Sequence, residues 1–273
     1  MIMDKVVKDI GELSVDVAAT IINCHTGNAG PLVAPIVKYL LKRGLDKVIK
    51  DVVSRQLSDM QKTKVNEVRD YAILTFYKLA EENGWEENNS EAYSYTQAIT
   101  ESIEDIFNKA VNESRRAKRI ILGAYLGSSL YHSNSPNPSW ENFFYISTII
   151  ERLTFRQLCM ISLIGQRFDG FKKEGERLSI TDKVAITELN DLQSQNFWLP
   201  AMSFMGGTPK EIPLDYITPT DTTLDLKSAI IFPEAIREDY LRVVESMKIM
   251  PLTPPNYPNG FLSMLDRARN NNQ

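Results

Sequence analysis

Cysteine and histidine are both scarce in this chain. Its 273 residues include two cysteines, Cys24 and Cys159, and two histidines, His25 and His132. Two cysteines cannot form the disulfide framework of a small secreted domain, so we expect reduced thiols. Two histidines leave little for histidine-based acid–base chemistry, and neither belongs to a paired metal-ligand spacing. We therefore expect no metal, no cofactor and no enzymatic activity, with Cys159 an inert thiol in an apolar helical setting.

Long apolar runs are also absent. No segment approaches the ~20 consecutive apolar residues that a membrane-spanning helix needs, because residues such as Lys38 and Lys42 interrupt the candidates. The N-terminus has no basic segment followed by an apolar core, so we expect no signal peptide. These absences predict a cytoplasmic protein without a transmembrane segment.

A strong net charge of either sign is missing as well. The formal net charge is −4, and hydrophobic residues make up 43% of the chain, which is enough for a globular core. Dedicated nucleic-acid-binding proteins are usually basic, so this balance argues against nucleic acid as a partner.

Helical periodicity is what the sequence has in abundance. Apolar residues recur every three or four positions over 3–22 and 31–57, which predicts two amphipathic helices. Two capping boxes, Ser58 to Gln61 and Thr154 to Gln157, predict the starts of further helices. We predict these further helices over about 59–80, 92–131 with a break near 112–114 or at Gly123, 140–152, 155–166, 179–195 with Ser179 and Asp182 as caps, 218–231 and 233–247.

Two short stretches, 198–205 and 212–216, are compatible with β-structure, and the turn residues 206–209 between them predict a hairpin. The fold class is therefore mainly α, with an N-terminal helical bundle followed by a small winged-helix-like α+β module. We expect the bundle over 1–135, the module over 139–250 and an irregular tail over 251–273. The predicted core of the module consists of Leu158, Leu189, Leu192, Phe197 and Trp198.

A resemblance rests on three segments of the C-terminal part. Leu153–Cys159 opens a helix, Thr187–Leu192 carries paired leucines and leads to Phe197-Trp198, and Ile217-Thr218-Pro219-Thr220 follows the expected hairpin. This pattern resembles the winged-helix endings of many bacterial regulators and defence proteins. The whole layout resembles bacterial abortive-infection alpha-type proteins. The resemblance implies a role in bacterial phage defence or stress response, and it implies no catalytic residue.

Charged residues are unevenly distributed along the chain. Residues 38–64 carry a net charge of +5, residues 81–105 carry −8 without a lysine or arginine, and residues 115–119 form a second basic cluster. Such asymmetry can guide association with a partner or between copies of the chain. The candidate interaction residues are Lys38, Lys42, Arg43, Lys47, Lys50, Arg55, Arg115, Arg116, Lys118 and Arg119.

Three interpretations of the basic helix over 31–57 remain open. It can dock on the acidic segment 81–105 of the same or a neighbouring chain, lie on anionic lipid as a peripheral membrane contact, or simply be solvated. The absence of tryptophan and phenylalanine over 32–53 favours docking over lipid.

We predict a non-enzymatic interaction or effector protein with a protein partner or a homo-oligomeric state. The alternative is a winged-helix DNA-binding transcriptional regulator. Its recognition helix would cover 181–195, where Lys183 stands against Asp182, Glu188 and Asp191, and a negative helix is repelled by phosphates. An enzyme with a site assembled from scattered residues is a third possibility, which no motif supports.

Overall fold

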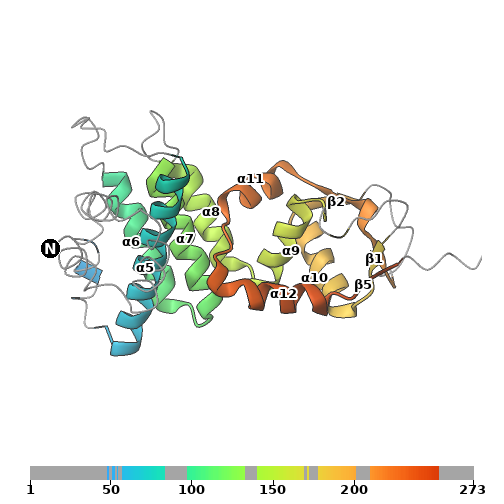
Figure 1. Cartoon of the computed structure of the whole chain (residues 1–273), viewed down its shortest axis with the longest axis horizontal. Coiled ribbons are helices and arrows are strands. Elements are labelled where there is room, and N and C mark those ends of the chain that lie inside the picture. The colour runs from blue at the N-terminus through green and yellow to red at the C-terminus, as the bar shows by residue number, and fades with distance from the viewer. Residues whose placement is uncertain are drawn as a thin grey trace, which may run out of the picture.

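The computed structural model describes residues 48, 51–52, 54, 57–83, 97–132, 140–168, 171, 178–200 and 210–251. Within them the fold is mainly α-helical with small antiparallel sheets, as predicted (Figure 1). The predicted helix over 3–22, most of the helix over 31–57 and the tail beyond Pro251 lie outside the described residues. Val48 and Val52, from the apolar stripe of the second of these helices, are buried in the core.

The helices of the N-terminal part begin and end where local signals predict. Helix α5 starts after Ser58, whose hydroxyl accepts from the Gln61 amide at 3.3 Å while the Ser58 amide donates to the Gln61 side chain at 3.0 Å. This capping box is confirmed. The break near residue 112 is also confirmed, whereas Gly123 lies inside an uninterrupted helix. Among the described residues of this part, the helices with defined bounds are α5 (Asp59–Glu82), α6 (Gln97–Asn112), α7 (Arg116–His132) and α8 (Trp140–Arg152).

Gly123 and Gly127 bring α7 into backbone contact with α5. A Cβ atom at Gly123 would lie 2.6 Å from the Val68 carbonyl oxygen, and one at Gly127 would overlap the Ala72 carbonyl group. The two glycines are four residues apart and so face the same side of α7. They are therefore needed for a close helix approach, which is why Gly123 does not bend the helix.

The C-terminal part begins with α9, which a second capping box starts: the Thr154 hydroxyl accepts from the Gln157 amide at 3.1 Å. Short strands and helices follow. In chain order these elements are α9 (Phe155–Gly165), β1 (Leu178–Ile180), α10 (Lys183–Ser194), β2 (Trp198–Pro200), β3 (Ile212–Pro213), η2 (Leu214–Tyr216), β4 (Ile217–Pro219), α11 (Asp221–Ala229), η3 (Glu234–Ile236), α12 (Arg237–Ser246) and β5 (Ile249–Pro251).

The strands pair differently from the predicted hairpin. β2 and β3 begin at the predicted residues, Trp198 and Ile212, but β2 pairs with β4, and β3 pairs with β1. β1 also pairs with β5, so it is the central strand of the sheet β3-β1-β5. The sequence pattern of a hairpin indicates only which residues favour strands. The strands that pair with β2 and β3 come from segments that are distant in sequence.

Ser179 is another correction. It was expected to cap a helix, but it lies in β1 with its side chain buried, where its hydroxyl donates to Glu211 at 3.0 Å. The N-cap of α10 is Asp182, whose carboxylate accepts from the Ala185 amide at 3.0 Å. Because serine and aspartate are both good N-caps, the sequence alone could not separate them.

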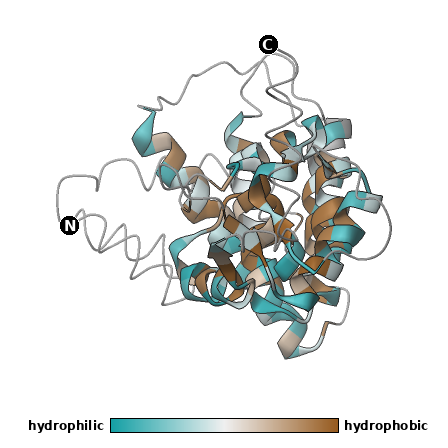
Figure 2. Ribbon diagram, turned by 90° about the vertical axis from the view of Figure 1, so that its right-hand side faces the viewer, coloured by the Kyte–Doolittle hydropathy of each residue, from teal (hydrophilic) through white to brown (hydrophobic). Residues whose placement is uncertain are grey.

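The predicted core of the C-terminal module is confirmed. Leu158, Leu189, Leu192, Phe197 and Trp198 are all buried. The Trp198 indole N–H donates to the Leu189 carbonyl at 2.7 Å, which satisfies the one polar group of that ring. Hydrophobic segments gather towards the middle of the view in Figure 2 and hydrophilic ones towards its edge, and the buried residues form one continuous cluster.

Helix α8 packs against α6 and α7, and Figure 1 shows it beside them, apart from α10 and the strands. Packing of helix on helix therefore continues to Arg152. The division into a bundle over 1–135 and a module over 139–250 stays a prediction.

We predict that Gly127→Ala destabilises the protein by about 1–3 kcal/mol, because the added methyl group overpacks the α5–α7 contact. In an exposed helix position the replacement of a poorer helix former by alanine is stabilising. Asn108→Ala on the exposed face of α6 is the matched control, and we expect it to be neutral or slightly stabilising. Thermal unfolding of both variants measures the difference, and an unchanged melting temperature for Gly127→Ala would show that the helices do not approach so closely.

Candidate functional site

Six of the ten predicted interaction residues, Lys38, Lys42, Arg43, Lys47, Lys50 and Arg55, lie outside the residues whose side chains the structure describes. Docking of their helix on the acidic segment 81–105 stays a prediction. Asp105 of that segment was expected to be solvated, but it pairs with Lys109 on its own helix.

The second basic cluster is largely engaged inside the fold. Arg116 and Arg119 both bind Glu67 of α5, with Nε–Oε distances of 2.8 and 2.7 Å. Arg119 also donates to the backbone carbonyls of Glu113 and Ser114, at the end of α6. A cation at a helix C-terminus satisfies carbonyl groups that lack an intrahelical partner.

Lys118 is buried and caps another helix. Its ammonium group lies 2.6 Å from a Glu113 carboxylate oxygen and donates to the Glu151 carbonyl, near the end of α8, at 2.8 Å. Burial raises the pKa of Glu113, but the bonds from Lys118 and from backbone amides outweigh it and leave that pKa lowered. Within this cluster the exposed cations are Arg115 and the ion-paired Arg116.

A buried polar group joins α6 to α8. The Lys109 ammonium contacts Asp105 at 2.5 Å and the Ser147 hydroxyl at 2.7 Å, and Ser147 donates to Asp105 at 3.0 Å. The Ser147 side chain is fully buried, so a substrate cannot reach its hydroxyl group. These contacts therefore position two helices rather than form a nucleophilic site.

Arg156 of α9 holds the acidic residues of α10. Its guanidinium lies 3.2 Å from Asp182 and 2.5 Å from Glu188. The pKa of Asp182 is lowered, first by the Ala185 amide and also by Arg156, whereas burial raises the pKa of Glu188 despite that cation. The exposed charges of α10 are then Lys183 and Asp191, so its outer face is less acidic than the sequence suggested.

Cys159 is buried, and burial raises the pKa of its thiol, as expected for an inert core cysteine. His132 is exposed at the end of α7, where its Nδ1 atom lies 2.8 Å from the Ser128 carbonyl oxygen.

Among the described residues, no group of three histidine, cysteine, aspartate or glutamate side chains is arranged to hold a metal ion. No helix in the described ranges is both long and apolar enough to cross a membrane.

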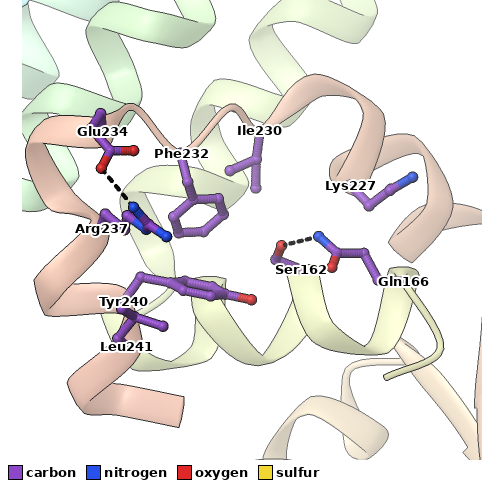
Figure 3. A pocket seen from close by; sticks show the side chains of 9 residues that line it. All are labelled: Ser162, Gln166, Lys227, Ile230, Phe232, Glu234, Arg237, Tyr240 and Leu241. Carbon is purple, nitrogen blue, oxygen red and sulfur yellow. Dashed lines mark hydrogen bonds and ion pairs between the residues drawn. The ribbon is translucent and has the colours of Figure 1, made fainter. Parts of the chain in front are cut away.

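The candidate site is a pocket of about 440 Å³ between α9, α11, η3 and α12 (Figure 3). We call it the α9–α12 pocket. It lies in the C-terminal part, where α11 and α12 flank α9 (Figure 1). Its lining mixes hydroxyl, amide, charged and aromatic side chains: Ser162, Gln166, Lys227, Ile230, Phe232, Glu234, Arg237, Tyr240 and Leu241.

Polar side chains of α9 and α12 form one wall of this pocket. The Gln166 amide donates to the Ser162 hydroxyl at 3.2 Å, and the Tyr240 hydroxyl points towards Ser162 in Figure 3. Burial raises the pKa of Tyr240, so its phenol is protonated at neutral pH. These polar groups face one another across α9 and α12, where they can also bind a ligand.

Gly165 sets the position of Lys227, which lines the pocket beside Gln166 (Figure 3). A Cβ atom at residue 165 would lie 2.6 Å from the Cβ atom and 2.8 Å from the Cγ atom of Lys227. The glycine therefore lets the stem of Lys227 lie directly on α9. Sequence reasoning missed this pocket because its two sides are separated by about sixty residues; the available signal was the pair Ser162 and Gln166, polar and four apart on an otherwise apolar helix.

No protein-family model, no curated protein and no solved structure matches this chain. The residues of the α9–α12 pocket therefore have to be interpreted from their own geometry.

We predict that Arg156→Ala lowers the free energy of unfolding at neutral pH by about 1–3 kcal/mol, because Asp182 and Glu188 lose their shared cation. Arg242→Ala, which removes an exposed cation paired only with exposed carboxylates, is the control, with an expected loss below about 1 kcal/mol.

The loss from Arg156→Ala should shrink as the pH falls from 7 towards 4.5. The folded-state pKa of Glu188 is raised above 4.5, so as the pH falls Glu188 is protonated in the folded protein before it is protonated in the unfolded chain. In Arg156→Ala this protonation removes the buried negative charge that has lost its cation. Asp182 stays ionised in this window, because its pKa is lowered from 3.8. Thermal unfolding at both pH values measures the effect, and an equal loss at both would contradict the role assigned to Glu188.

Proposed function

We propose that this chain is a non-enzymatic interaction or effector protein whose C-terminal part binds a ligand in the α9–α12 pocket. The observation that carries the proposal is the convergence of polar groups from separate elements on that pocket. Ser162 and Gln166 come from α9, Lys227 from α11, and Arg237 and Tyr240 from α12. Convergent polar groups in the concave part of a surface are the usual mark of a ligand site.

Binding is favoured over catalysis by the state of these groups. The Ser162 hydroxyl accepts from the Gln166 amide, and the Tyr240 phenol that points towards it is protonated, so neither group is a base at neutral pH. Activation of a serine requires an adjacent general base. The phenol and the amide instead offer hydrogen-bond donors at fixed positions, which is the arrangement that a binding site needs.

The biological setting in this proposal is bacterial phage defence or stress response in the cytoplasm, and it rests on the resemblance to abortive-infection alpha-type proteins. Winged-helix-like character of the module is part of the same proposal. Its support is the order of α9, β1, α10 and β2, with Trp198 at the exit from α10 packed on Leu189. In this proposal a protein partner or a second copy of the chain binds the protein and responds to the ligand-bound state of the module.

The alternative is DNA binding through α10, whose exposed face carries less negative charge than its sequence indicates. Arg156 offsets the charges of Asp182 and Glu188, which leaves one exposed cation and one exposed carboxylate on the helix. Repulsion from phosphates is therefore smaller than the sequence suggested, but the several cations that neutralise a phosphate backbone are still missing from this face.

We predict that the protein does not bind duplex DNA with sub-micromolar affinity. Fluorescence anisotropy at ~50 mM salt is the most permissive measurement, since low salt strengthens every phosphate contact. Tight binding that weakens with salt and is lost in Lys183→Glu would favour the regulator instead.

We also predict that Gln166→Trp abolishes protection of a bacterial host against phage, if the chain confers it, because the indole fills the pocket. Gln166 is exposed at the C-cap of α9, so the folded core should tolerate the change. Gln195→Trp at the exposed C-cap of α10 is the matched control and should leave protection intact. Plaque counts on hosts expressing each variant are the readout, and full protection by Gln166→Trp would contradict a role for the pocket.

A further inference from the structure

Lys227 is the starting point for identifying the kind of ligand. It lines the α9–α12 pocket, and no carboxylate among the described residues forms an ion pair with its ammonium group. Its stem is held against α9 by the close contact at Gly165. A cation that is positioned in a pocket without a counterion is suited to bind an anionic group.

Arg237 adds a second cation. Its guanidinium makes one contact with Glu234, at 3.1 Å, and both of these side chains are mostly exposed. Figure 3 shows the guanidinium beside the ring of Phe232, facing into the pocket. The lining therefore holds two cations and one carboxylate, a net charge of +1. One negative charge on a ligand would balance it.

The rest of the lining selects for a flat apolar group. The rings of Phe232 and Tyr240 are 5.1 Å apart with their planes inclined at 59°, and Ile230 and Leu241 extend this apolar part. Aromatic rings bind a further ring in offset or edge-to-face arrangements. Figure 3 places both rings between Arg237 on one side and Ser162, Gln166 and Lys227 on the other, so a ligand on the rings lies between the two cations.

We infer that the α9–α12 pocket takes a small anion built on an aromatic ring, either an aryl carboxylate, with one negative charge, or an aryl phosphate, with up to two at neutral pH. The anionic group binds Lys227 at the end of the pocket that Ser162 and Gln166 line, and the ring packs on Phe232 and Tyr240. The Ser162, Gln166 and Tyr240 groups donate to or accept from substituents of the ring. A pocket of about 440 Å³ suits a molecule of this size. This inference rests on the proposed function, because it names the ligand of the same site.

Fluorine NMR on the full-length chain tests the ligand class. The probes are para-fluorobenzoate and para-fluorophenyl phosphate, each with a ring and a charge, and para-fluorobenzyl alcohol, which has the ring alone. Inorganic phosphate, added as a competitor, supplies the charge alone. We expect one or both charged probes to bind at least about tenfold more tightly than the alcohol and than phosphate. The tighter of the two charged probes distinguishes a carboxylate ligand from a phosphate ligand.

Two lysine variants separate the pocket from general electrostatic attraction. Lys227→Met should weaken binding of the charged probes by about tenfold and leave the neutral alcohol unchanged. Lys183→Met removes the same charge from the exposed face of α10 and should have no effect. Equal affinity for charged and neutral probes, or equal effects of the two variants, would overturn the inference.

The outcome also separates this inference from the proposed function. If Gln166→Trp abolishes protection but no aromatic anion binds, the pocket functions and the ligand class is wrong. If aromatic anions bind in the pocket but protection does not depend on it, the ligand class stands and the proposed function falls. If neither assay responds, both are wrong.

Discussion

The backbone contact between α5 and α7 at Gly123 and Gly127 is the constraint on which the bundle depends. Carbonyl groups of Val68 and Ala72 occupy the space where side chains would otherwise stand. This approach brings Arg116 and Arg119 of α7 within reach of Glu67 on α5, and α6 and α8 pack around the pair. Two residues without side chains thus determine where the long charged side chains of the same helix can bind.

Several lysines and arginines that the charge pattern of the sequence suggested would be exposed instead donate hydrogen bonds to carbonyl groups at or near helix C-termini. Lys64 and Arg119 donate to carbonyls at the end of α6, and Lys118 donates to one at the end of α8. Helix C-terminal carbonyls are acceptors without intrahelical partners, so a nearby cation satisfies them and interacts favourably with the helix dipole. A basic cluster at the start of one helix can therefore donate hydrogen bonds to the C-terminal carbonyls of neighbouring helices. The spacing of charges along the sequence does not distinguish this role from exposure on an outer surface.

Local signals were sufficient for the described helices, apart from the starts of α10 and α11, and not for the contacts between them. Both capping boxes and the buried leucines of the module follow from the order of residues within a few positions, and the structure confirms them. The partners of β2 and β3, the ion pairs of Arg156 and the pocket all join segments that are distant in sequence, and no periodicity reports such pairing. Ser162 and Gln166 were visible as polar positions on an apolar helix, but what faces them was not.

Helix α9 contacts each of the helices that surround the candidate site and so positions them relative to one another. Arg156 in its first turn holds α10, Ser162 in its last turns faces Tyr240 of α12, and Gly165 at its end admits the stem of Lys227 from α11. The buried side of the same helix carries Leu158 and Cys159 into the common core. Because the core fixes α9 and α9 contacts α10, α11 and α12, the pocket walls are held by the fold rather than by contacts between α11 and α12 themselves. A ligand that binds between these two helices would then contact elements whose relative positions the apolar core has already set.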